Sequence, residues 1–181
     1  MPDPALCTEA VNPNYTAGTF TLYVTPEGEA EQNIGNINTG GFQFTPNMLE
    51  HRRGIDNSLD FIMLLGKDFF INFTADEITI GNMAIALNET PVPTASGCKI
   101  PLTGDRCVKE YGARLVHNYP CQEKTMTITI WRAAILSDWT LAFDAGAFAS
   151  YANQIRALYC GSAHPTEPYG KMEIDEPCPW S

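Results

Sequence analysis

The stretch Thr19–Thr25, TFTLYVT, decides the fold class of this chain. Apolar Phe20, Leu22 and Val24 alternate in it with threonine and tyrosine, and this period of two predicts a strand with one buried face. The same alternation returns in Lys124–Trp131, KTMTITIW. β-Branched residues favour the extended backbone of strands. We therefore expect a mainly β protein, an antiparallel β-sandwich or barrel.

Three further segments extend this prediction along the chain. Gln32–Thr45 repeats the alternation around Gly40–Gly41, which predicts a second strand with a turn or bulge at the glycines. Leu59–Phe73 has two apolar runs that meet at Gly66–Lys67, and this pattern predicts a hairpin of two strands. Apolar runs on both sides of Ser137–Asp138 predict another hairpin.

One short helix is predicted within Ala75–Glu89, where apolar residues recur at spacings of three and four. Asp76, Glu77 and Thr79 precede this pattern and suit the start of a helix. Residues 145–160 fit both a helical and a strand pattern, so periodicity alone leaves that segment open.

The chain is expected to form a single domain over residues 1–181, because 181 residues suit one hydrophobic core. Residues 1–18 carry three prolines and small polar residues, and they are expected to form an N-terminal arm. Residues 162–181 are rich in proline and are expected to form an extended C-terminal tail.

The charge of the chain excludes some partners. A net charge of −10 argues against specific nucleic-acid binding, which needs clustered lysine and arginine. No apolar run is long enough for a membrane-spanning helix, so no membrane partner is expected. The start lacks a secretion signal, and the six cysteines are accordingly expected to be reduced and to act as small hydrophobic residues.

No local catalytic motif is present, so we expect a protein that is not an enzyme and needs no cofactor. A weak candidate for a zinc site consists of three thiols and an imidazole: Cys98, Cys107, His117 and Cys121. Their spacing matches no familiar zinc motif, and we expect no metal there.

The segment Met48–Ser58, MLEHRRGIDNS, shows neither the helical nor the strand period, and a charged loop is expected. Arg52 and Arg53 form a basic pair in an acidic chain, with apolar Ile55 nearby. Two interpretations remain open for this loop: contact with carboxylates of another copy, or a solvated surface.

Four segments together resemble the major tail tube proteins of siphophages, the phages with long non-contractile tails. They are GNINTGGFQFTPNMLEHRRGI at 35–55, INFTADEITIGNMAIALNE at 71–89, WRAAIL at 131–136 and IRALYCGSAHPTEPYGKMEI at 155–174. The resemblance implies a β-sandwich with one flanking helix, and a strand at 145–160. It also implies a structural virion protein of the phage tail, assembled in the host cytoplasm.

The resemblance further implies homohexameric rings that stack into a tube. Viral DNA would pass through the lumen of this tube into the host without specific binding. The other partners implied are the tape measure, distal tail and terminator proteins. The inter-ring contact would be a loop made of Glu50, His51, Arg52, Arg53, Gly54, Ile55, Asp56 and Asn57. Both terminal segments would add contacts.

Two alternatives remain. The first is the tube protein of a contractile tail or of a secretion system, which has a related fold. The second is a small β-sandwich module that binds carbohydrate, with Trp131, Trp139 and Trp180 as stacking candidates.

Overall fold

A computed structural model describes residues 19–35, 37–53, 59–75, 77–102, 108–119, 124–135, 140–142 and 150–175. Within these residues the chain is mainly β with one short helix, as expected. The elements are β1 Thr19–Pro26, β2 Gln32–Asn33, β3 Ile37–Arg52, β4 Leu59–Ala75, α1 Ile80–Ala86, β5 Val92–Thr94, β6 Gly97–Lys99, β7 Tyr111–Asn118, β8 Thr125–Ile135, β9 Thr140–Ala142, β10 Ser150–Ala157 and β11 Gly170–Ile174.

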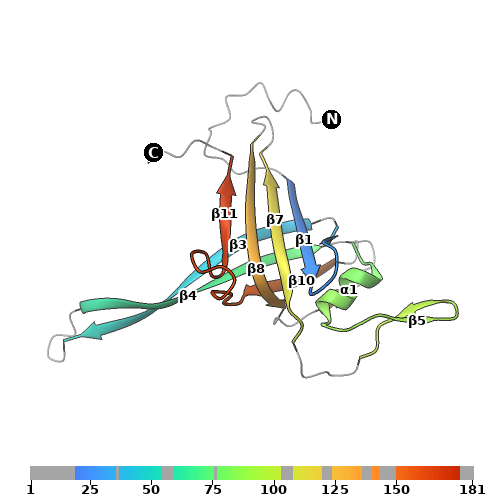
Figure 1. The fold of residues 1–181 in the computed structure, drawn as a ribbon, viewed down its shortest axis with the longest axis horizontal. Coiled ribbons are helices and arrows are strands. Elements are labelled where there is room, and N and C mark those ends of the chain that lie inside the picture. Colours follow the sequence, from blue (N-terminus) through green and yellow to red (C-terminus); the bar gives the residue numbers. More distant parts are fainter. Residues whose placement is uncertain are drawn as a thin grey trace.

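Nine of the strands form one antiparallel sheet that folds into two layers. Bonded neighbours run in the order β2-β1-β7-β8-β10-β4-β3, with β11 added to β8 and β9 added to β10. The sheet divides at β8, because Met126–Ile130 pairs with β11 while Ala133–Ile135 pairs with β10. Figure 1 accordingly shows β11, β8, β7 and β1 side by side, with β3, β4 and β10 crossing behind them.

The core lies between these layers and follows the predicted alternation. Leu22 and Val24 of β1 are fully buried, and so are Ile71 of β4 and Ile155 of β10. Each such side chain contributes about 1.5–3 kcal/mol when it leaves water. The antiparallel β-sandwich is therefore confirmed, and β10 confirms a strand within residues 145–160.

Helix α1 is held to the sheet by its first residues. The hydroxyl of Thr79 accepts a hydrogen bond of 3.1 Å from the backbone N–H of Asn82, which confirms Thr79 as the helix cap. The buried amide of Asn82 donates to the carbonyls of Ile34 at 2.5 Å and Glu77 at 3.0 Å. These bonds fix α1 against the connection between β2 and β3. No helix in the described ranges is long and apolar enough to cross a membrane.

The hairpin turn predicted at Gly66–Lys67 is wrong, because β4 runs through it without a break. β3 and β4 pair from end to end, but between Asn47 and Met48 the register on β4 moves by two residues, from Gly66 to Leu64. Leu65 is therefore the extra residue of a β-bulge. Glycine next to a bulge is a common strand feature, and here it resembles a turn signal in the sequence.

The turn or bulge predicted at Gly40–Gly41 is also wrong, since both glycines keep an unbroken register with β4. A Cβ on Gly40 would lie 3.7 Å from the ring of Phe20 on β1. This distance is an ordinary van der Waals contact, so β3 packs against β1 here, near the other end of the strand order, and the packing does not require a glycine.

Two predictions near the C-terminus need correction. β9 pairs with β10, and β8 pairs with β7, β10 and β11, so the described residues show no hairpin of β8 with β9 around Ser137–Asp138. The predicted extended tail includes Gly170–Ile174, which is instead a sheet strand, β11, paired with β8. Met172 and Ile174 are the apolar residues of an alternating strand pattern, which is hard to recognise because the flanking sequence is rich in proline. The predicted N-terminal arm, 1–18, and residues 176–181 lie outside the described residues.

Candidate assembly surface

A two-stranded ribbon leaves the sandwich, and Figure 1 shows it projecting away from the body. It forms because β10 pairs with β4 only over Phe70–Ala75, whereas β3 stays paired with β4 to the end of both strands. We call Met48–Arg52 together with Leu59–Leu65 the hairpin arm. An isolated two-stranded hairpin is only marginally stable in water, and no third strand pairs with this ribbon among the described residues.

Large apolar side chains cover the hairpin arm on both faces, because neighbours in a strand point in opposite directions. Eight of them are 47–62% exposed: Met48, Leu49, Leu59, Phe61, Ile62, Met63, Leu64 and Leu65. Soluble monomers rarely expose a contiguous apolar patch larger than a few hundred Å². The hairpin arm therefore has the character of a protein contact surface.

The sequence predicted that the contact between copies is a loop at residues 50–57. The structure instead places the first part of this segment in a strand. Glu50, His51 and Arg52 belong to β3, so a loop is wrong for these three residues. Pairing with the apolar start of β4 imposes the extended backbone there. Arg53 follows the strand, and Gly54–Asn57 (Gly54, Ile55, Asp56 and Asn57) lie outside the described residues.

The charged side chains near the end of the hairpin arm pair mainly with each other. Arg52 lies 2.7 Å from Glu50, and Arg53 lies 3.6 Å from Asp60. His51 Nδ1 is 3.3 Å from the other oxygen of Asp60. Such exposed pairs contribute about 0–1 kcal/mol each. They offset much of the charge near the end of the arm.

A polar cluster fixes the base of the hairpin arm. Asp68 of β4 accepts hydrogen bonds from the amide of Asn47 on β3 and from the guanidinium of Arg156 on β10, each 2.9 Å long. The bond from Asn47, followed by the bond from Arg156, lowers the pKa of Asp68 below its ordinary value. The carboxylate therefore links three strands where the arm begins.

An aromatic cluster lies at the same base. The ring of Phe69 on β4 lies 5.9 Å from Phe42, 5.7 Å from Phe44 and 5.4 Å from Tyr169. Aromatic pairs at these separations add about 0.5–1.5 kcal/mol beyond the area that they bury. The cluster connects β3 and β4 to the segment that leads into β11.

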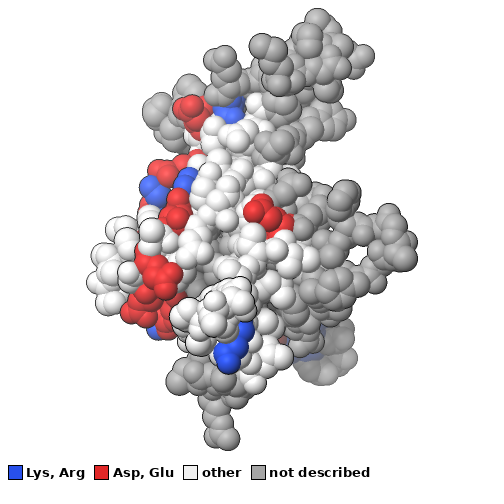
Figure 2. Space-filling view, turned by 90° about the vertical axis from the view of Figure 1, so that its right-hand side faces the viewer, with Lys and Arg blue, Asp and Glu red and all other residues white. Residues whose placement is uncertain are grey.

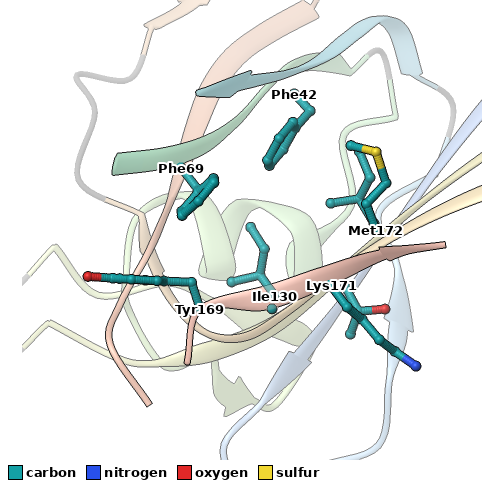
Figure 3. A pocket seen from close by; sticks show the side chains of 9 residues that line it. Phe42, Phe69, Ile130, Tyr169, Lys171 and Met172 are labelled. Atoms are coloured by element: carbon teal, nitrogen blue, oxygen red, sulfur yellow. The ribbon is translucent and has the colours of Figure 1, made fainter. Parts of the chain in front are cut away.

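An apolar cavity of about 250 Å³ opens beside the aromatic cluster. We call it the interlayer cavity, because Phe42 and Phe69 line it from one layer and Ile130 and Met172 from the other. Figure 3 shows these side chains around the cavity, with Tyr169 at one end. It lies where the sheet divides between β10 and β11.

A second depression lies beside α1 and is acidic. Figure 2 shows patches of acidic side chains on this side of the molecule, with fewer basic ones. The depression is lined by Glu27, Glu29, Glu89 and Glu110, among other residues. Burial, followed by the charge of Glu29, raises the pKa of Tyr111 to about 12. Such a surface disfavours contact with nucleic acid.

The weak zinc candidate does not come together in the described residues. His117 is fully buried on β7, where its ring stacks 4.5 Å from Phe20, and neither ring nitrogen has a hydrogen-bond partner among the residues that the structure describes. Cys98 on β6 is a free thiol, as expected of a reduced cysteine, but its side chain is exposed and does not pack as a small hydrophobic residue. Cys107 and Cys121 lie outside the described residues, and the described part of the chain contains no group of metal ligands.

Of the three tryptophans proposed to stack on a sugar, Trp131 lies within the described residues. Trp131 stacks on His164 with ring centres 4.2 Å apart, and its indole N–H donates to the carbonyl of Glu167 at 3.0 Å. One face of this ring is therefore already covered. Trp139 and Trp180 lie outside the described residues.

Sequence reasoning missed the apolar residues of the hairpin arm as a contact surface, because it treated Leu59–Leu65 as one strand of a hairpin that turns at Gly66–Lys67. A signal was present: in IMLL, Ile62–Leu65, apolar residues occupy both faces of the strand in succession. A strand on the outside of a sandwich normally alternates. Apolar residues on both faces indicate burial on both sides, and here a partner would have to supply it.

No family model matches this chain, and no curated protein matches it in sequence. In structure it is similar to a chain in the cryo-electron microscopy structure of the six-fold symmetrised baseplate of the anti-feeding prophage. The TM-score is 0.55 at 11% sequence identity, over 88% of this chain and 94% of the other. At this identity the similarity establishes a shared fold.

Proposed function

We propose that this protein is a structural subunit of a phage-type tail, and that its copies assemble into six-membered rings that stack as a tail tube. The observation that carries the proposal is the hairpin arm, a long apolar ribbon that the described part of its own chain leaves uncovered. Apolar surface of this extent stabilises a protein when another protein covers it.

The shared fold supports the proposal from a second direction. The similar chain belongs to a phage-derived baseplate with six-fold symmetry, a multi-subunit assembly. By analogy this chain would be part of a virion and would contact other tail proteins. Tubes of contractile tails and of non-contractile tails both suit this analogy, so the proposal covers both classes.

The acidic character of the chain fits a tube that DNA passes through. A net charge of −10 repels phosphate, so DNA would move through such a tube without binding to its wall. This repulsion would favour passage of the DNA over adhesion to the wall.

The test is the assembly state of the purified full-length chain, followed by sedimentation velocity and negative-stain electron microscopy over a hundredfold range of concentration. Rings or tubes are the expected result. The variant Ile62→Glu with Leu64→Glu is expected to stay monomeric, because it places two charges on the exposed arm. Its matched control is Val92→Glu with Val108→Glu, two exposed positions outside the arm. A wild-type chain that stays monomeric at every concentration would refute the proposed function.

A further inference from the structure

We propose that the interlayer cavity is the receptor for apolar side chains of the hairpin arm of a second copy of this chain. This inference rests on the proposed function and assigns a docking surface to it. The occupant is the apolar part of the arm, and not its charged end, because the charges there pair within the arm.

The exposed area of the arm matches an interface between two copies. Each of its eight large apolar side chains is about half exposed. If a large side chain contributes roughly 150–250 Å² when fully exposed, the eight half-exposed side chains present on the order of 600–1,000 Å², a range that includes the roughly 800 Å² that each partner contributes to a standard interface. The arm alone thus offers enough surface for a stable contact.

The cavity has the size and chemistry of a receptor for side chains. Its volume of about 250 Å³ is below the roughly 300–1,000 Å³ typical of small-molecule pockets. The labelled wall residues Phe42, Phe69, Ile130 and Met172 are apolar, whereas Lys171 directs its amine away from the cavity in Figure 3 and pairs with Glu173 at 2.8 Å. Few polar groups are available to orient a cofactor, and one or two apolar side chains fit such a site.

The cavity also continues toward the arm along an open groove. A neighbouring depression of about 480 Å³ is lined by Leu64, Leu65, Phe69 and Tyr169, and the last two residues also line the interlayer cavity. Over Leu59–Phe69, β4 has no strand partner among the described residues on the side opposite β3. An extended apolar segment from another chain could therefore pair with the backbone N–H and C=O groups of β4 on this side and pack against apolar side chains.

The arm of the same chain does not fill this site. The bonds of Asp68 and the rings around Phe69 fix the base of the arm beside the cavity, and Figure 1 shows the arm leading away from the body. Arm and cavity are different surfaces of one copy, so their contact joins copies head to tail. A contact of this kind is repeated from copy to copy and closes into a ring or continues as a filament.

The test uses two full-length variants, each with one impaired surface. Met172→Glu places a charge at the cavity, on a side chain that is 49% exposed, and Ile62→Glu with Met63→Glu impairs the arm at two exposed residues that line neither the cavity nor the neighbouring groove. The control for the cavity is Ile174→Glu, which lies on the same strand, is 44% exposed and does not line the cavity. Urea unfolding midpoints close to the wild-type value establish that the variants fold.

Each impaired variant alone is expected to be monomeric, with at least a tenfold rise in the concentration needed for assembly. An equimolar mixture of the two is expected to give two-copy complexes, because one intact arm meets one intact cavity. A mixture that stays monomeric overturns the inference. A Met172→Glu chain that assembles like the wild type and the Ile174→Glu control also overturns the inference, but it leaves the proposed function standing. A wild-type chain that never assembles refutes the proposed function itself.

Discussion

The carboxylate of Asp68 accepts a hydrogen bond of 2.9 Å from Arg156, which ties β4 to β10 where the hairpin arm leaves the sandwich. Asn47 on β3 donates to the other oxygen of the same carboxylate. The orientation of the arm therefore depends on a group that titrates.

The first prediction concerns pH. The pKa of Asp68 is lowered from its ordinary value of 3.8, so its stabilising effect is fully present above that value and is lost as the pH falls through the lowered pKa. Asp68→Asn should lower the urea midpoint slightly at neutral pH, because the side chain of Asp68 is only partly buried and water screens its charge. The difference from the wild type should shrink below about pH 4. A difference that stays constant at acidic pH would count against the role of the charge.

The second prediction concerns the aromatic cluster. Phe69→Ala should lower the free energy of unfolding by about 2–4 kcal/mol, because a partly buried ring that packs on the core and touches three other rings is lost. Phe61→Ala, at an exposed position on the arm, should change it by less than about 1 kcal/mol. Equal effects in urea unfolding would show that the cluster does not anchor the arm.

The third prediction concerns the cap of α1. Thr79→Ala removes the acceptor for the N–H of Asn82 and should destabilise the protein by about 1 kcal/mol. Thr79→Ser keeps a hydroxyl and should retain most of the stability. Thermal unfolding of the three proteins measures this, and an alanine variant as stable as the serine variant would contradict the role of the cap.

The fourth prediction concerns the start of β11. Gly170 has a φ of +152°, and a Cβ there would collide with the backbone oxygen of Thr129. Gly170→Ala should therefore cost more than about 2 kcal/mol and disturb the wall of the interlayer cavity. In contrast, a Cβ on Gly41 meets no atom within 4 Å, so Gly41→Ala should change stability by less than about 1 kcal/mol. Comparable unfolding midpoints for the two variants would refute the steric argument.

The fifth prediction concerns the charged end of the arm. Arg52→Glu with Arg53→Glu should change the free energy of unfolding by less than about 1 kcal/mol per lost ion pair, because both side chains are exposed. The variant should assemble poorly at low salt, since four acidic groups would then face copies that are themselves acidic.

Added salt should restore its assembly, because screening weakens repulsion between exposed charges. Arg52→Lys with Arg53→Lys keeps the charge and serves as the control. Normal tube length for the charge-reversed variant at low salt would show that this end of the arm makes no contact between copies.

The sequence by itself determined the strands whose one face is buried. In β1 and the first part of β8, apolar residues alternate with polar ones, and this local pattern requires one face toward a core. The cap at Thr79 was equally local, because a hydroxyl three residues before an amide N–H needs no distant partner. Such features depend only on residues a few positions apart.

Only the tertiary structure decided how far β3 and β4 continue and what surrounds them. Gly66 is compatible both with a turn and with a strand beside a bulge. It lies in a strand because β3 pairs with β4 on both sides of it. Leu65 is apolar in the sequence whether it is buried or exposed, and it is exposed because β10 ends its pairing with β4 at Phe70. Exposure depends on which distant strands pair, and local periodicity carries no information about that pairing.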